Sequence, residues 1–170
     1  MYFWGMTGVG KSSLGKKMAK SLGWEFLDLD RAISKAEGLS VSSIFQERGE
    51  GYFRDIERKV LHSFHDKQKV IIATGGGTPC FHNNDNWMLE HGLCIWLDAP
   101  IGMIANRITN AKSKRPLLEG LEEGALLRKL DQMMDLRGKN YQKAHMIVSV
   151  NNVTDTQLAS MLQSIIQETP

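Results

Sequence analysis

A glycine-rich octapeptide near the amino terminus constrains the fold of this chain more than any other segment. It reads Gly5-Met6-Thr7-Gly8-Val9-Gly10-Lys11-Ser12 and fits the pattern G-x-x-x-x-G-K-[ST]. An apolar run at residues 1–4 precedes it, and Leu14, Met18 and Leu22 follow at the four-residue steps of a helix. The octapeptide therefore joins a predicted strand to a predicted helix, which is the context in which this pattern forms a phosphate-binding loop, or P-loop.

The residue types of this loop suit the binding of a nucleoside triphosphate. Glycine lacks a Cβ, so the backbone can turn tightly and point N–H groups at phosphate oxygens beside the positive end of the helix. We expect Lys11 to reach the β- and γ-phosphates and the Ser12 hydroxyl to ligate Mg²⁺. At average residue frequencies, a chance match in a chain of this length is roughly a one-in-a-hundred event. The predicted ATP-binding residues of the loop are Gly8, Val9, Gly10, Lys11, Ser12 and Ser13.

Short apolar runs separated by helical patterns indicate the fold class. The runs lie at residues 1–4, 24–27, 70–73, 93–97 and 146–150. Near the carboxyl terminus, Thr154 and Gln157 have the spacing of a capping box, which predicts the start of a last helix. We expect an α/β protein, a single domain over residues 1–170, with a mostly parallel sheet and ligands at the carboxyl ends of its strands.

Composition and charge argue against several classes of partner. With 21 basic and 19 acidic residues, the formal charge of +2 is too small to indicate a nucleic-acid partner. No apolar run approaches the ~20 residues of a membrane span, and residues 1–6 do not resemble a secretory signal. Cys80 and Cys94 lack a C-x-x-C spacing, so we interpret them as reduced thiols of a cytoplasmic protein.

Two carboxylates follow the second apolar run. Asp28 and Asp30 stand two residues apart at a predicted strand end, and in an extended chain they point to the same side. One could serve a metal and the other a substrate hydroxyl, whereas an isolated D-x-D is more often a solvated turn. The third strand is followed by Ala73-Thr74-Gly75 rather than by the aspartate of a usual Walker B motif. Asp28 is therefore the candidate metal ligand, directly or through a water.

Several ordered motifs resemble those of the shikimate kinase family over nearly the whole chain. They are the P-loop, Phe26 to Asp30, Gly49-Glu50 with Phe53-Arg54 and Glu57, Thr74 to Gly77, Arg115 to Leu118, and Arg137 four residues before Tyr141. The resemblance implies a three-layer P-loop fold with a five-stranded parallel sheet flanked by helices. It also implies transfer of the γ-phosphoryl of ATP to the 3-hydroxyl of shikimate, a step of chorismate and aromatic amino-acid biosynthesis. The residues between Arg137 and Tyr141 depart from the family, which often has a proline there.

The resemblance assigns acceptor-binding roles to residues of a region around 31–64 and beyond it. Arg54 and Arg137 would clamp the shikimate carboxylate, because guanidinium forks suit planar carboxylates, and Glu57 would orient Arg54. Asp30 would hold ring hydroxyls and is the candidate base for the attacking hydroxyl, although positioning can matter more than basicity in a loose transition state. The glycines that would line this acceptor site are Gly75, Gly76 and Gly77.

The resemblance also completes the nucleotide site. Lys11 and Arg115 would neutralise charge on the transferring phosphoryl, with Arg115 carried by a lid around residues 111–120. Arg107 would stack on adenine, and the loop at residues 151–154 would flank the base. The family leans towards a monomer.

Two other functions remain open at this point. Another small-metabolite kinase of the same fold, such as a gluconate or nucleotide kinase, would share the P-loop, and fold alone cannot separate these activities. The pair of Arg54 and Arg137 with Asp30 suits a carboxylated polyol better than a nucleotide. A nucleotide-dependent switch without kinase activity is disfavoured as a GTPase, because the chain lacks the guanine-reading motif N-K-x-D.

Overall fold

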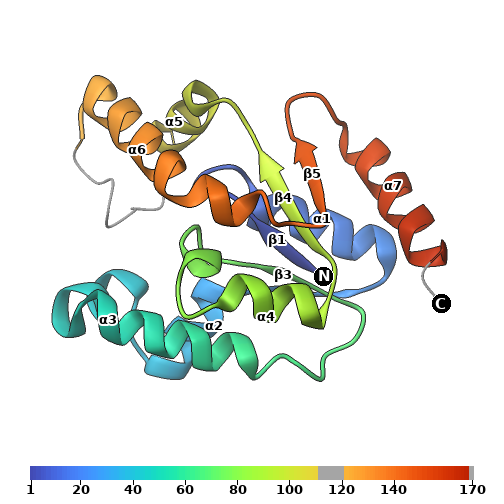
Figure 1. Ribbon diagram of the computed structural model, residues 1–170, viewed down its shortest axis with the longest axis horizontal. Coiled ribbons are helices and arrows are strands. Elements are labelled where there is room, and N and C mark those ends of the chain that lie inside the picture. Colours follow the sequence, from blue (N-terminus) through green and yellow to red (C-terminus); the bar gives the residue numbers. More distant parts are fainter. Residues whose placement is uncertain (111–120, 169–170) are drawn as a thin grey trace.

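Helices separate the five strands along the chain, as the apolar runs predict (Figure 1). The computed structural model describes residues 1–110 and 121–168. The strands are β1 (Tyr2–Trp4), β2 (Glu25–Asp28), β3 (Val70–Ala73), β4 (Cys94–Asp98) and β5 (Met146–Ser149). The helices are α1 (Lys11–Leu22), α2 (Leu29–Glu37), α3 (Val41–His62), α4 (Asn84–His91), α5 (Ile101–Thr109), α6 (Glu123–Tyr141) and α7 (Asp155–Glu168), with a 3₁₀ helix η1 at Thr78–Cys80. None of the helices within these residues is long and apolar enough to cross a membrane.

The five strands form one parallel sheet in the order β2-β3-β1-β4-β5. The central strand β1 pairs on one side with β3, where Tyr2 faces Ile72, and on the other with β4, where Tyr2 faces Cys94. All of β3 and most of β4 are buried, as expected for inner strands that helices cover on both faces. The predicted fold class, including the parallel sheet of five strands, is confirmed.

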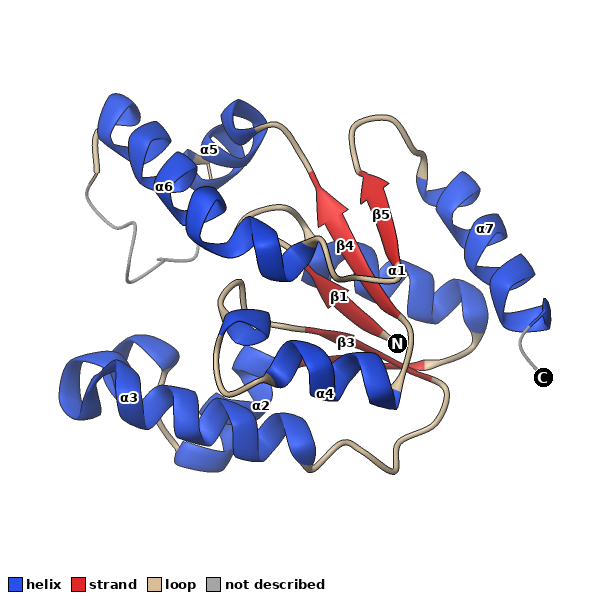
Figure 2. Ribbon diagram, viewed as in Figure 1, coloured by secondary structure: helices blue, strands red, loops and turns tan. Residues whose placement is uncertain are grey.

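Helices cover the two faces of the sheet (Figure 2). The helices α1 and α7 pack against each other on one face, and α4 and α6 lie on the other, in front of the sheet in this view. Trp4 of β1 is fully buried, and its indole N–H donates to Met88 Sδ of α4 over 3.3 Å. The strand that leads into the P-loop is thus held from both faces, which fixes where the loop begins.

The structure differs from the sequence prediction after β2. The sequence predicts an extended chain through Asp28 and Asp30, but Asp28 ends the strand and Leu29 already begins α2. The Asp28 side chain caps this helix by accepting a hydrogen bond from the Arg31 backbone N–H over 3.2 Å. Both carboxylates nevertheless line one cavity with the P-loop. A capped helical turn brings them together, rather than the pleat of a strand.

Two pairs of helices stand at the carboxyl edge of the sheet, α2 with α3 on one side and α5 with α6 on the other (Figure 1). The helix α3 is kinked at Gly49, whose φ of 80° lies in the left-handed region that favours glycine. After the kink, Arg54 and Glu57 are buried, whereas the next residue, Arg58, is exposed. The predicted lid at residues 111–120 lies outside the described residues.

Candidate active site

The P-loop connects β1 to α1 and surrounds a cavity of about 290 Å³. Gly5 and Gly10 have φ values of 130° and 110°, which side chains with a Cβ rarely adopt, so glycine is required at both motif positions. The Lys11 ammonium lies over the loop, where it donates to the carbonyl oxygens of Gly5 at 2.7 Å and Met6 at 3.0 Å. The cavity therefore has backbone N–H groups, a helix N-terminus and a cation on one side, which suits a polyphosphate.

Ser12 and Asp28 place two oxygen ligands beside this cavity. Ser12 Oγ donates to Asp28 Oδ2 over 2.5 Å, and both residues line the cavity with Lys11. Mg²⁺ prefers oxygen ligands and is usually held by one or two protein groups together with substrate phosphates and water. A hydroxyl and a carboxylate that already touch at the phosphate-binding loop fit that requirement, as the sequence predicts for these two residues.

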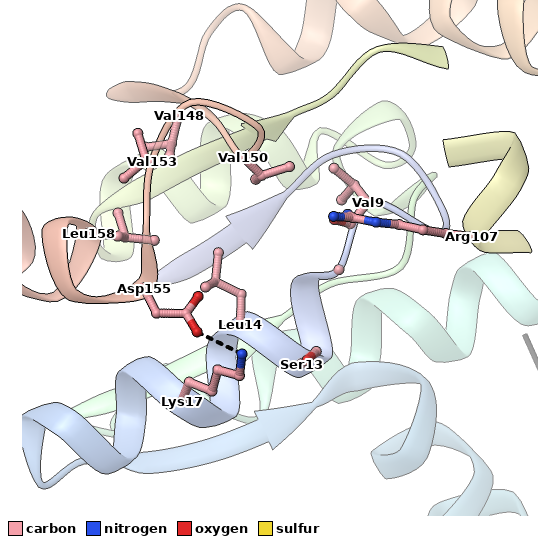
Figure 3. Close-up of a pocket in the computed structure, with 11 residues that line it drawn as sticks. Val9, Ser13, Leu14, Lys17, Arg107, Val148, Val150, Val153, Asp155 and Leu158 are labelled. Atoms are coloured by element: carbon pink, nitrogen blue, oxygen red, sulfur yellow. Dashed lines mark hydrogen bonds and ion pairs between the residues drawn. The ribbon is translucent and has the colours of Figure 1, made fainter. Parts of the chain in front are cut away.

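A second cavity of about 370 Å³ adjoins the first on the side of β5 and α7 (Figure 3). Arg107 lines both cavities, and its Nη1 donates to the Val9 carbonyl oxygen over 2.6 Å. Of the predicted base-flanking loop, Val153 contributes to the wall, and Lys17 and Asp155 close one edge through an ion pair of 2.6 Å. The remaining apolar wall consists of Val9, Leu14, Val148, Val150 and Leu158. The shape and apolar lining suit a flat heterocyclic base.

Arg54 is the most tightly held cation of the described site. Its side chain is 6% exposed, and its guanidinium donates to Glu57 Oε2 at 2.9 Å and to Glu50 Oε1 at 2.8 and 3.2 Å. The Phe81 ring lies 4.0 Å from the guanidinium carbon. Among the described residues, these contacts use three of the five N–H groups of the guanidinium, one each on Nε, Nη1 and Nη2. A planar guanidinium held in this way can present further N–H groups to a carboxylate.

Glu57 fixes the orientation of Arg54 from a fully buried position. While Oε2 accepts from Arg54, Oε1 accepts from the Thr78 hydroxyl over 2.6 Å. The resemblance suggested the contact between Glu57 and Arg54, whereas Thr78 was missed. The sequence signal for Thr78 was its position directly after three glycines. If the glycines face a ligand, the next side chain must point back into the protein.

The three glycines after β3 lie against three different predicted acceptor-binding side chains. A Cβ on Gly75 would stand 3.2 Å from Asp30 Oδ1, and one on Gly76 would stand 3.1 Å from Arg137 Nη1. On Gly77 it would stand 2.7 Å from Arg54 Nη2, closer than a Cβ is found in proteins. The loop thus brings Asp30, Arg54 and Arg137 to one place, although they are far apart in the sequence.

Arg137 projects from the last turns of α6, and Tyr141 of the same helix is fully buried and donates to the Gly76 carbonyl oxygen. Burial raises the pKa of the Tyr141 phenol, so it stays a donor at neutral pH. Burial also raises the pKa of the neighbouring Cys80 thiol to about 11, although the charges of Arg137 and Arg54 act in the opposite direction. Cys80 is therefore a neutral side chain between the two guanidinium groups.

Of the predicted site residues, Arg115 lies outside the described part of the chain. The others gather at the carboxyl edge of the sheet in two groups. The nucleotide group is Gly8, Val9, Gly10, Lys11, Ser12, Ser13, Asp28 and Arg107, and the acceptor group is Asp30, Arg54, Glu57, Gly75, Gly76, Gly77 and Arg137. A P-loop with an apolar pocket on one side and the buried Arg54 with the half-buried Arg137 on the other is the arrangement of a P-loop kinase.

Comparison with known proteins narrows this class. A sequence model described as "Shikimate kinase" matches residues 7–169. The chloroplastic shikimate kinase of Solanum lycopersicum is 40% identical over 159 residues, and the match covers 90% of this chain and 52% of that protein. The chain thus spans about half the length of this relative.

Solved structures agree with the sequence match. The shikimate kinase of Bacteroides thetaiotaomicron has a TM-score of 0.90 and 33% identity, covering 98% of this chain and 97% of that one. The shikimate kinase of Acinetobacter baumannii, solved in complex with shikimate, has a TM-score of 0.87 and 31% identity, covering 99% and 93%. The chain belongs to the shikimate kinase family.

Proposed function

We propose that this protein transfers the γ-phosphoryl of ATP to the 3-hydroxyl of shikimate, giving shikimate 3-phosphate and ADP. One observation carries the proposal: the successive glycines Gly75, Gly76 and Gly77 lie against Asp30, Arg137 and Arg54. One carboxylate and two guanidinium groups match a ligand with ring hydroxyls and one carboxylate. The relative from A. baumannii supports this choice, since it was solved with shikimate bound.

On the nucleotide side, the chain supplies positioning and positive charge. The P-loop N–H groups and Lys11 hold the phosphates, and Arg107 packs on the adenine in the cavity between Val9 and Val153. Ser12 and Asp28 would hold Mg²⁺, which would supply neutralisation of the negative charge on the phosphates. Arg115 adds a further cation by resemblance to the family.

On the acceptor side, Arg54 and Arg137 bind the shikimate carboxylate and thereby fix the ring. The 3-oxygen then attacks the γ-phosphorus: an oxygen–phosphorus bond forms to shikimate, and the bond from that phosphorus to the β–γ bridging oxygen breaks to release ADP. The hydroxyl proton leaves during the transfer, and Asp30, which lines the P-loop cavity, is the candidate to receive it. Because the transition state of phosphoryl transfer is loose, most of the rate enhancement comes from positioning and charge neutralisation.

The direct test is ATP consumption by the purified protein with Mg²⁺, measured with shikimate, with gluconate and with nucleoside monophosphates as separate acceptors. The proposal predicts turnover that depends on shikimate, and one equivalent of shikimate 3-phosphate for each ADP. If gluconate or a nucleotide is phosphorylated instead, the P-loop assignments stand and the acceptor assignments fail.

The proposal extends to a monomeric cytoplasmic enzyme without a nucleic-acid or membrane partner. Both Cys80 and Cys94 are free thiols, and Cys94 is buried, which suits a reducing compartment. The formal charge of +2 offers no electrostatic basis for binding a polyanion surface. Light scattering after gel filtration tests the monomer, for which we expect a mass near 19.1 kDa.

A further inference from the structure

Asp85 is a buried acid that no step of the proposed reaction uses. It lies in the first turn of α4, and its side chain is 4% exposed. Its Oδ2 accepts hydrogen bonds from Lys143 Nζ at 2.6 Å and from Asn140 Nδ2 at 2.9 Å. Burial opposes the ionisation of Asp85, but these hydrogen bonds outweigh it and hold the pKa of the carboxyl below its usual value. Asp85 is therefore an anion with two partners in another part of the chain.

Both partners lie more than fifty residues further along the chain, Asn140 in the last turn of α6 and Lys143 in the turn that follows this helix. Asn140 lies in the last turn of this helix and also donates to the Pro79 carbonyl oxygen over 3.3 Å. Tyr141, the next residue, donates to the Gly76 carbonyl oxygen. The end of α6 is thus tied to the segment 76–85 by Asp85, by the backbone of η1 and by the backbone of the glycine loop.

These ties act on the helix face that carries Arg137. Positions 137, 140 and 141 are related by steps of three and four residues, so their side chains share one face of α6. Arg137 itself reaches the glycine loop, where a Cβ on Gly76 would stand 3.1 Å from its Nη1. A long arginine side chain has many rotamers, and its guanidinium is confined only if the backbone that carries it is fixed.

We propose that Asp85 is a positioning residue for the acceptor site: through Asn140 and Lys143 it holds the end of α6 so that Arg137 meets the substrate carboxylate. This inference rests on the proposed function, in which Arg137 binds that carboxylate. A role in stability alone explains the arrangement less well, because an ion pair with an exposed partner such as Lys143 contributes little to stability. The hydrogen bonds of Asp85 instead fix the position of the end of α6, and an arginine that binds a ligand needs its backbone fixed in this way.

The test compares steady-state kinetics of Asp85→Asn, Asn140→Ala and Lys143→Met with those of a matched control, Lys139→Met. Lys139 is exposed on the same helix and loses the same charge without touching Asp85. The first three variants should raise the KM for shikimate roughly tenfold, because they shift Arg137 without removing it. A full misplacement of about 1 Å can cost roughly a hundredfold. The KM for ATP and the kcat at saturating shikimate should stay within about twofold of wild type, and Lys139→Met should change none of them.

The decisive comparison adds Asp85→Asn to Arg137→Ala. If Asp85 acts through Arg137, Asp85→Asn raises the KM for shikimate in the wild-type background and has no further effect once Arg137 is absent. The same increase in both backgrounds, an unchanged KM for shikimate, or a parallel increase in the KM for ATP would each overturn the inference.

The proposed function can be judged separately in this experiment. If Arg137→Ala weakens shikimate binding while the Asp85, Asn140 and Lys143 variants do not, the positioning role fails and the proposed function stands. If the wild-type protein does not phosphorylate shikimate, both fail together. If Asp85→Asn does not fold, Asn140→Ala and Lys143→Met test the positioning role in its place, because they remove donors that are not fully buried. The measured quantity is again the KM for shikimate.

Discussion

The nucleotide half and the acceptor half of the proposed active site differ in how many parts of the chain form them. The nucleotide half depends on one continuous segment, Gly5 to Ser12, whose backbone conformation is set by glycine and whose cation, Lys11, lies on the carbonyl oxygens of its own loop. The acceptor half draws Asp30, Arg54 and Arg137 from three helices, and a short glycine loop brings them together.

This difference shows two physical solutions to binding an anion. Phosphates are held largely by backbone N–H groups and the end of a helix, which need little support from other side chains. In the proposed function, a single carboxylate is held by guanidinium groups, which must themselves be confined by buried partners such as Glu57 for Arg54. Substitution of residues that never touch the substrate should therefore weaken binding at the acceptor half, and should weaken binding at the nucleotide half much less.

The largest expected effect concerns Lys11. Lys11→Ala removes a cation from the transferring phosphoryl, and we expect kcat to fall by at least about a hundredfold, as for the loss of one preorganised donor to a developing charge. A coupled assay of ADP release measures it. Substantial activity in a folded variant would remove Lys11 from the mechanism.

Arg54→Ala and Arg137→Ala should each weaken shikimate binding by about 1.5 to 3 kcal/mol, because a charge-assisted contact is lost, and leave the KM for ATP almost unchanged. Initial rates measured across both substrate concentrations give the two constants. An unchanged shikimate affinity in both variants would contradict the carboxylate clamp.

A smaller effect is expected when the glycine loop is crowded. In Gly77→Ala, the new Cβ would stand 2.7 Å from Arg54 Nη2, and Glu50, Glu57 and Phe81 leave that guanidinium little room to move. We expect a loss of about 1–3 kcal/mol in stability and a severalfold rise in the KM for shikimate. Gly51→Ala on α3 is the control, because a Cβ there meets nothing within 4 Å. Equal behaviour of the two variants in kinetics and urea unfolding would refute this account of the loop.

The smallest expected effect is the pH dependence of stability at Asp85. Its folded pKa is lowered, so its contribution is complete above the unfolded value of about 4 and is lost as the pH falls from there towards the folded pKa. Urea unfolding of wild type and Asp85→Asn between neutral pH and pH 3 should show a stability difference that narrows on acidification. A difference that stays constant over this range would mean that Asp85 is not ionised in the folded protein.

Much of the nucleotide half and of the sheet is predictable from the sequence, because the relevant signals are local. The run at Val70 to Ala73 matches β3 throughout, and Thr154 and Gln157 form the predicted capping box, in which each side chain bonds the other's backbone N–H. The P-loop is predicted from eight consecutive residues together with the apolar run before them and the helical spacing after them. Local patterns of this kind report local backbone conformation directly.

The acceptor half could not be derived from local patterns. The roles of Arg54 and Arg137 came from resemblance to a family, since no spacing in the sequence shows that these residues meet at a glycine loop. The interaction of Asp85 with Asn140 was not foreseen at all, because it joins helices 55 residues apart. The turn at Asp28 was misjudged because an aspartate suits both a strand end and a helix cap, and the cap prevails here.

The most direct test of the separation between the two halves is calorimetric titration of Lys11→Ala and Arg137→Ala, each with shikimate and with ATP. We predict a crossed result, in which Lys11→Ala binds shikimate within about threefold of wild type and loses ATP affinity, and Arg137→Ala does the reverse. If either substitution weakens the binding of both ligands to the same extent, the nucleotide and acceptor halves are not built separately.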